Sequence, residues 1–142
     1  MMTDWQIDQF LEESTRRSAR GASTAGALFD DCEPAVPSPE QRQLVESCAQ
    51  VARRSGLQLL RIRLAWRHGR PDICAGAIRI QDGQMIVALS VDVDPPNLAL
   101  SVLHELQHAH DLTCWPGRFT RTELEMRAVA FARETVSRLP WS

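Results

Sequence analysis

Two histidines four residues apart, His104 and His108, enclose a glutamate at position 105 in the segment His-Glu-Leu-Gln-His. On an α-helix, residues four apart are rotated by only about 40° and lie one turn apart, so both imidazoles point the same way. Two imidazoles placed in this way can bind one zinc ion at about 2.0–2.1 Å. Glu105 stands beside the first histidine, where it can hold a water molecule on the metal and accept its proton. The spacing therefore predicts a zinc site with a glutamate as general base.

The residues around this motif favour a metal site over two histidines placed there by chance. The segment from Leu98 to Leu112 is apolar on both sides of the motif, so the predicted helix is largely buried. A buried pair of imidazoles needs partners, and a metal ion is the simplest one. We therefore expect one Zn²⁺ per chain.

A catalytic zinc site has a third protein ligand and an open position for water, and several residues are candidates for that ligand. Asp111 follows His108 by three residues on the same helical face. Alternatively, it accepts a hydrogen bond from a ligand imidazole or belongs to the last turn of the helix. Cys74 would give a Cys-His-His site, although a lone cysteine is more often a small buried apolar residue. The remaining candidates are two glutamates at the start of the last predicted helix, Glu123 and Glu125.

A helical projection of the last predicted helix separates the two glutamates. Glu125 falls on the apolar face, and Glu123 falls on the polar side. The apolar face is formed by Leu124, Ala128, Val129, Phe131, Ala132, Val136 and Leu139. A carboxylate on a buried face needs a cation or a metal. We therefore favour Glu125 as the ligand, and expect Glu123 to be solvated and to help cap the helix after Thr120 or Thr122.

The two segments together resemble a known family. His104-Glu-Leu-Gln-His108, followed after a short connection by Glu125-Met-Arg-Ala-Val-Ala-Phe-Ala, looks like the gluzincin pattern of zinc metallopeptidases. It is most similar to the ImmA/IrrE-type metallopeptidases and to stand-alone minimal gluzincins, over about residues 57–135. The resemblance implies that His104, His108 and Glu125 are the zinc ligands and that Glu105 is the catalytic base.

The resemblance also implies a fold, namely an α+β, minimal zincin-like domain. A small antiparallel or mixed sheet would pack on an active-site helix and a C-terminal helix, with an N-terminal helical or extended arm. In zincins the strand before the active helix is commonly a sheet edge along the cleft, where an extended substrate can pair with it. Met85–Val91 is therefore either such an edge or a core strand with no substrate role.

The sequence departs from the family pattern at two points. Val129 occupies the place where an aspartate often supports the first histidine, so that role passes to Asp111 or to a backbone carbonyl. The chain has no tyrosine, so His110, His68 or an arginine would have to polarise the scissile carbonyl. His110 lies about 200° round the helix from His108 and cannot bind the same ion. The alternative interpretation is that His110 is simply an exposed histidine near the end of the helix.

Periodicity along the chain predicts the order helix, three strands, helix, helix. The helices are expected over Pro39–Arg54, about Leu98–Leu112 and Arg121–Arg138, and the strands over Leu57–Trp66, Gly76–Ile80 and Met85–Val91. Ser38 is the expected N-cap of the first helix, with Pro39 at its first position. Asp82-Gly83 lies between two segments of alternating apolar residues, which is typical of a two-residue hairpin turn. The segment Asp94-Pro95-Pro96-Asn97 is expected to end the sheet before the next helix.

We divide the chain into an N-terminal arm or linker, residues 1–38, and a metallopeptidase-like domain, residues 39–142. Residues 4–17 are expected to form a short helix, and the small, polar and proline-containing residues that follow are typical of a linker. The arm also contains Asp30-Asp31-Cys32-Glu33, whose acidic and thiol groups could occupy an open zinc position. We therefore hypothesise self-inhibition by residues 1–38, or a regulatory partner bound there.

Composition and charge exclude several classes of partner. The net charge is −2 and the basic residues form no block, so nucleic-acid binding is not expected. No segment is apolar over the length needed to span a bilayer, and the first residues lack the basic and apolar regions of a signal peptide. The four cysteines form no CxxC pair, and we expect them to be reduced. We therefore expect the protein to be cytoplasmic and not to bind a membrane.

These observations predict a zinc-dependent metallopeptidase, a hydrolase that cleaves peptide bonds through a water molecule held on zinc and activated by Glu105. A peptide or protein would be its substrate. One alternative is a catalytically silent zinc-binding regulatory or interaction domain. Another is a deformylase- or amidase-like hydrolase with Cys74 as the third ligand.

Overall fold

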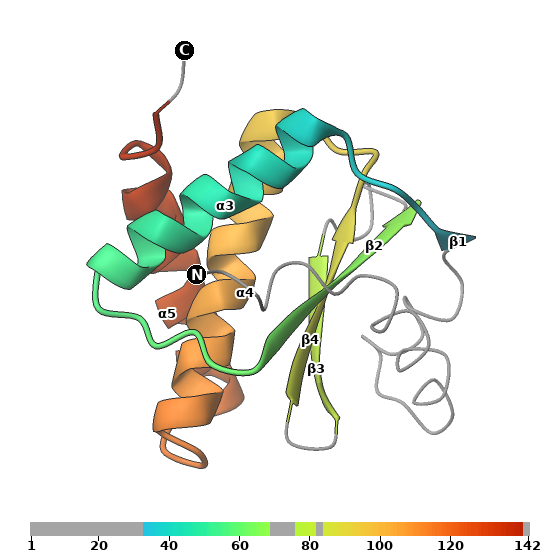
Figure 1. Ribbon diagram of the computed structural model, residues 1–142. Coiled ribbons are helices and arrows are strands. Elements are labelled where there is room, and N and C mark those ends of the chain that lie inside the picture. Colours follow the sequence, from blue (N-terminus) through green and yellow to red (C-terminus); the bar gives the residue numbers. More distant parts are fainter. Residues whose placement is uncertain (1–32, 69–75, 82–83, 141–142) are drawn as a thin grey trace.

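The computed structural model describes residues 33–68, 76–81 and 84–140. These residues form three helices on one side of a small sheet (Figure 1), and the α+β class predicted from the sequence is confirmed. The helices are α3 (Pro39–Arg54), α4 (Pro95–Cys114) and α5 (Arg121–Val136), and the strands are β1 (Glu33–Pro34), β2 (Ile62–His68), β3 (Gly76–Gln81) and β4 (Gln84–Ser90). Within these residues, no helix has both the length and the apolar character that crossing a bilayer requires.

The sheet is mixed, with the strand order β1-β2-β4-β3. Strands β2 and β4 run parallel, whereas β3 and β4 are antiparallel and leave two residues between the paired Gln81 and Gln84. This pairing is the hairpin expected around Asp82-Gly83, although the two turn residues lie outside the described part of the chain. Because β4 has a neighbour on each side and its residues Met85–Ser90 are buried, the interpretation of β4 as a substrate-binding edge is wrong. It is a core strand.

The strand expected from Leu57 begins five residues later, at Ile62. Leu57 and Leu59 are buried, whereas Leu60, which alternates with Ile62 and Leu64 in the sequence, is exposed, and the segment before Arg61 pairs with no described strand. Arg61 has a φ of 56°, a left-handed conformation that shifts the alternation by one residue, and Ile62 is buried instead of Arg61. The sheet therefore starts only after this local change of direction.

Helix α3 begins as predicted, whereas α4 begins earlier than predicted. The Ser38 side chain accepts a hydrogen bond from the Gln41 backbone N–H, and the Gln41 side chain accepts one from the Ser38 N–H, which forms a complete capping box. In α4, Asp94 is the N-cap and both prolines lie in the first turn, so the helix begins at Pro95 and not near Leu98. Proline is well tolerated there because the first helical N–H groups have no partner within the helix.

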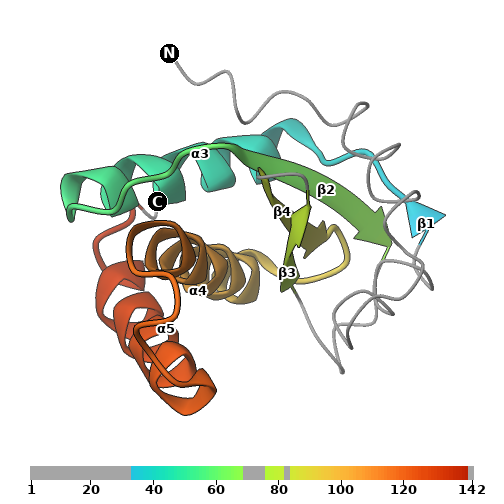
Figure 2. The same ribbon diagram turned by 90° about the horizontal axis from the view of Figure 1, so that it is seen from below.

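Helix α4 lies at the centre of the molecule, against α3, α5, β3 and β4 (Figures 1 and 2). Its buried residues are therefore distributed around most of the helix, and Leu98, Leu103 and Leu106 are fully buried, whereas the face of His104 and His108 is only partly buried. This position explains why the sequence is apolar on both sides of the histidine motif. The histidines thus project from the most enclosed helix of the described residues.

The end of the predicted arm is attached to the sheet. Glu33 and Pro34 pair with the last residues of β2, and the Ala35 N–H donates to the Trp66 carbonyl at 3.0 Å. The boundary at residue 38 stays a prediction. The helix expected over residues 4–17 and the group Asp30-Asp31-Cys32 lie outside the described residues.

Candidate metal centre

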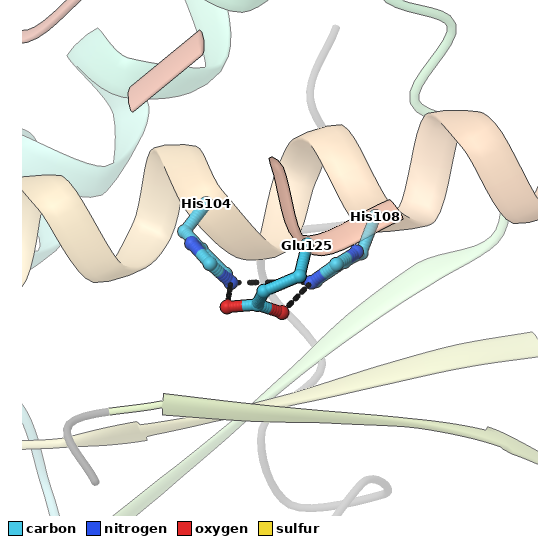
Figure 3. A group of neighbouring side chains, drawn as sticks. All are labelled: His104, His108 and Glu125. Atoms are coloured by element: carbon cyan, nitrogen blue, oxygen red, sulfur yellow. Dashed lines mark hydrogen bonds and ion pairs between the residues drawn. The ribbon is translucent and has the colours of Figure 1, made fainter. Parts of the chain in front are cut away.

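Three side chains from two helices bring their donor atoms together at one point (Figure 3). The Nε2 atoms of His104 and His108 on α4 are 3.1 Å apart. Glu125 on α5 places one carboxylate oxygen 3.1 Å from the His104 Nε2 and the other 3.2 Å from the His108 Nε2. Four ligands arranged tetrahedrally at zinc-like bond lengths are separated by about 3.3 Å, so these spacings are close to those of zinc ligands. We refer to His104, His108 and Glu125 as the triad.

Hydrogen bonds within the triad cannot satisfy all three of its contacts. If both histidines donate Nε2–H to Glu125, their two protons oppose each other across the 3.1 Å contact. If one histidine donates its Nε2–H to the other, the accepting Nε2 carries no proton to donate to Glu125. The lone pairs of that nitrogen and of the neighbouring carboxylate oxygen then face each other. At least one contact is therefore repulsive in every arrangement of neutral imidazoles. A cation between the three side chains would receive a lone pair from each of them, so the triad residues fit a bound metal ion.

The two histidines are enclosed, whereas the glutamate is accessible. The side chains of His104 and His108 are 21% and 12% exposed, and that of Glu125 is 58% exposed. Burial, followed by the neighbouring His104, lowers the pKa of His108, while Glu125 partly opposes this. A lowered pKa favours the neutral imidazole, which is the form that binds a metal. The Glu125 side chain is exposed and not buried as expected, although Glu125 shares with Ala128 and Ala132 the face of α5 that meets α4.

Glu105, the expected base, is a buried carboxyl group. Its exposed fraction is 7%, and it makes no side-chain hydrogen bond or ion pair with another described residue. Burial and then the charge of Glu125 raise its pKa to about 8. Positive charge nearby would favour its carboxylate form. A carboxyl group with such a displaced pKa beside possible metal ligands is typical of a functional site.

Asp111 lies outside the group of converging donors. It is fully buried, and its carboxylate accepts hydrogen bonds from Arg127 of α5 and from Gln107. It makes no hydrogen bond to either histidine of the triad. Arg127 was not predicted from the sequence as a site residue. The sequence did contain one signal for such a partner. Asp111 is a charged residue on the largely apolar helix α4, and a buried carboxylate requires a cation nearby.

The other predicted site residues do not join the triad. His110 is partly buried rather than exposed, and its Nδ1 accepts a hydrogen bond from the Gln58 backbone N–H at 2.9 Å. It lines a cavity of about 380 Å³ with Gln107 and Arg127. His68 is exposed at the end of β2, with its Nδ1 3.5 Å from Asp92. Cys74 lies outside the described residues.

Glu123 caps helix α5, as expected from its position. Its carboxylate accepts the Thr120 backbone N–H at 2.8 Å, and its own N–H donates to the Thr120 hydroxyl at 3.1 Å. We expect Glu123→Ala to lower the free energy of unfolding by about 0.5–1 kcal/mol, since the hydrogen bond from the Thr120 N–H to the Glu123 side chain is lost while the Thr120 cap remains. Its zinc affinity should remain within about twofold of the wild-type value, as measured by competition with a chromophoric chelator. A large loss of zinc affinity would identify Glu123 as a ligand.

The arrangement offers two imidazoles and a carboxylate to a cation, with a second carboxyl group beside them. These are the donor types that zinc takes in catalytic sites. The accessible side of Glu125 also leaves the triad open to solvent. The chain matches no protein-family model, no curated protein and no solved structure.

Proposed function

We propose that the protein is a zinc-dependent hydrolase of the metallopeptidase type, with His104, His108 and Glu125 as metal ligands and Glu105 as the general base. One observation carries the proposal: the Nε2 atoms of His104 and His108 are 3.1 Å apart and each lies 3.1–3.2 Å from one of the two Glu125 oxygens, beside a buried carboxyl group that has no partner in the described structure. The resemblance of these residues to the gluzincin pattern supports the same assignment. A zincin-like arrangement is part of the proposal, with α4 carrying the motif and α5 the third ligand.

The roles of the residues follow from their positions. Zinc bound by the triad would polarise a substrate carbonyl and lower the pKa of a water molecule. Glu105 follows the first ligand directly, so it can accept the proton of the attacking water and deliver it to the leaving amine. The lowered pKa of His108 favours its neutral form, and α4 directs both histidines towards Glu125. The peptide or protein substrate approaches from the exposed side of Glu125.

The deformylase-like alternative requires Cys74 as the third ligand. In the described structure Glu125 contacts both histidines through its two oxygens, which supports the gluzincin-type assignment instead. A zinc-binding domain without catalytic activity would use the same triad. Metal binding and turnover are therefore tested separately.

The metal assignment is tested by zinc content and affinity. We expect the wild-type protein to bind one Zn²⁺, and His104→Ala, His108→Ala and Glu125→Ala each to lower the affinity by at least about 100-fold. In zinc-finger peptides, about 10–16 kcal/mol of binding free energy is shared among four protein ligands, which gives roughly 3 kcal/mol for each ligand. Loss of one triad ligand should have a similar cost. Elemental analysis and chelator competition measure both quantities.

His110→Ala is the matched control, because it removes an imidazole from the same helix without touching the triad. Its zinc affinity should equal that of the wild type. A wild-type protein that neither contains zinc nor takes it up would refute the proposal.

A further inference from the structure

An ion pair between a buried carboxylate and a partly exposed arginine joins α4 to α5 beside the triad. The Asp111 carboxylate on α4 is 0% exposed and accepts hydrogen bonds from the Arg127 Nε at 2.8 Å and from an Arg127 terminal nitrogen at 2.9 Å. The Gln107 side chain donates a third hydrogen bond at 2.9 Å. The two parallel bonds from one guanidinium fix both the distance and the orientation of the partners.

Arg127 is itself held in place. Its guanidinium carbon lies 4.4 Å from the centre of the Phe119 ring, a cation–π contact from the connection before α5. A planar guanidinium between a carboxylate and an aromatic ring has little rotational freedom, unlike the ammonium group of a lysine. The pair is therefore a rigid link between the two helices.

The same helix interface carries the triad. On α4, Asp111 follows His108 by three residues, and on α5, Arg127 follows Glu125 by two. Residues of α4 and α5 thus meet twice within about one helical turn, once at the triad and once at the ion pair.

Little else in the described structure fixes the position of Glu125. Its side chain is 58% exposed and makes hydrogen bonds or ion pairs only with the two histidines among the described residues. The buried face of α5 contains two alanines, Ala128 and Ala132, together with Thr135. The larger Phe131 and Val136 pack against the core only about two and three turns further along α5. Near the triad, α5 therefore presents small side chains to α4, and the Asp111–Arg127 pair is the directional contact beside Glu125.

We propose that the Asp111–Arg127 pair positions the metal site by fixing the register of α5 against α4, so that the Glu125 carboxylate stays opposite His104 and His108. The inference rests on the proposed triad and adds two positioning residues to it. Arg127 and Asp111 act only through Glu125 and bind neither metal nor substrate. By linkage, metal binding stabilises the same helix register.

Arg127→Met tests the proposal through Zn²⁺ affinity and the visible absorption of the Co²⁺-substituted protein. We expect the zinc affinity to fall by about 10-fold or more, which is the size of effect found for residues that orient metal ligands. The Co²⁺ spectrum should change as well, because Glu125 no longer holds its position in the coordination shell. A loss of stability alone would not alter the spectrum of the folded, metal-loaded protein.

The double variant Asp111→Leu/Arg127→Met separates positioning from folding. It removes both charges, so no charge is left unpaired in the interior, and its resistance to urea should return towards the wild-type value. Its zinc affinity and Co²⁺ spectrum should remain altered, since apolar side chains do not fix the helix register. Val45→Ala on α3 is the control, because it removes buried volume and stability away from the α4–α5 contact.

Wild-type zinc affinity in the double variant would overturn the proposal, as would a loss in Arg127→Met no larger than that in Val45→Ala. A wild-type protein that binds neither Zn²⁺ nor Co²⁺ is a separate result. That result rejects the triad itself, and the positioning role fails with it.

Discussion

Glu105→Gln should abolish peptide hydrolysis and leave zinc bound. Glutamine has nearly the shape of glutamate but cannot accept the proton of the attacking water, and loss of a general base lowers turnover by about 10²–10⁴-fold. The triad is unchanged in this variant, so the zinc content should stay at one ion per chain. Turnover of a quenched fluorescent peptide library and elemental analysis of the same samples measure the two effects.

Glu123→Gln is the matched control, because it makes the same chemical change at a glutamate that caps α5. Its turnover should equal that of the wild type. A zinc-loaded wild-type protein that cleaves no peptide, or a Glu105→Gln variant with full biological activity, would favour the catalytically silent domain. Cleavage restricted to formylated peptides would favour the deformylase-like alternative.

Arg127→Ala should cause the largest loss of folding stability among the substitutions considered. The change leaves the Asp111 carboxylate, which is 0% exposed in the wild-type structure, with only Gln107 as a side-chain hydrogen-bond donor. Removing one partner of a buried ion pair costs about 3–5 kcal/mol, and we expect a value near the lower limit because the Arg127 side chain is 41% exposed. Urea denaturation of the metal-free protein measures this free energy of unfolding.

Arg118→Ala is the control for this prediction. Arg118 also lies over an aromatic ring, with its guanidinium carbon 5.4 Å from the centre of the Trp115 ring, but it is exposed. Its loss should cost no more than about 1 kcal/mol. Equal losses for the two arginine variants would show that the ion pair contributes little to folding.

Features of the fold that depend on interactions between residues close in sequence, such as the starts of helices, could be predicted from the sequence. Ser38 and Thr120 begin their helices because their side chains accept backbone N–H groups only three residues away. The start of β2 depends instead on Arg61, whose carbonyl accepts the Met85 N–H from a distant strand. The placement of β4 between β2 and β3 is likewise a long-range pairing. Neither can be derived from the residues nearby.

The same distinction applies to the candidate site. Helical spacing places His104 and His108 together, and the projection selected Glu125, although it wrongly expected a buried side chain. The Asp111–Arg127 pair was not predicted, because the two charges lie on different helices and meet only when α4 and α5 adopt their observed register. The sequence showed a carboxylate on an apolar helix but not the residue that neutralises it.

The triad is local in sequence, since His108 and Glu125 are separated by only 17 residues within one pair of consecutive helices. Closing a short loop costs little conformational entropy, whereas the parallel pairing of β2 with β4 must bring together strands separated by β3. The α4–α5 hairpin can therefore form before the sheet is complete. If the ligands are already together in the folding transition state, bound zinc would mainly accelerate folding and change the unfolding rate little.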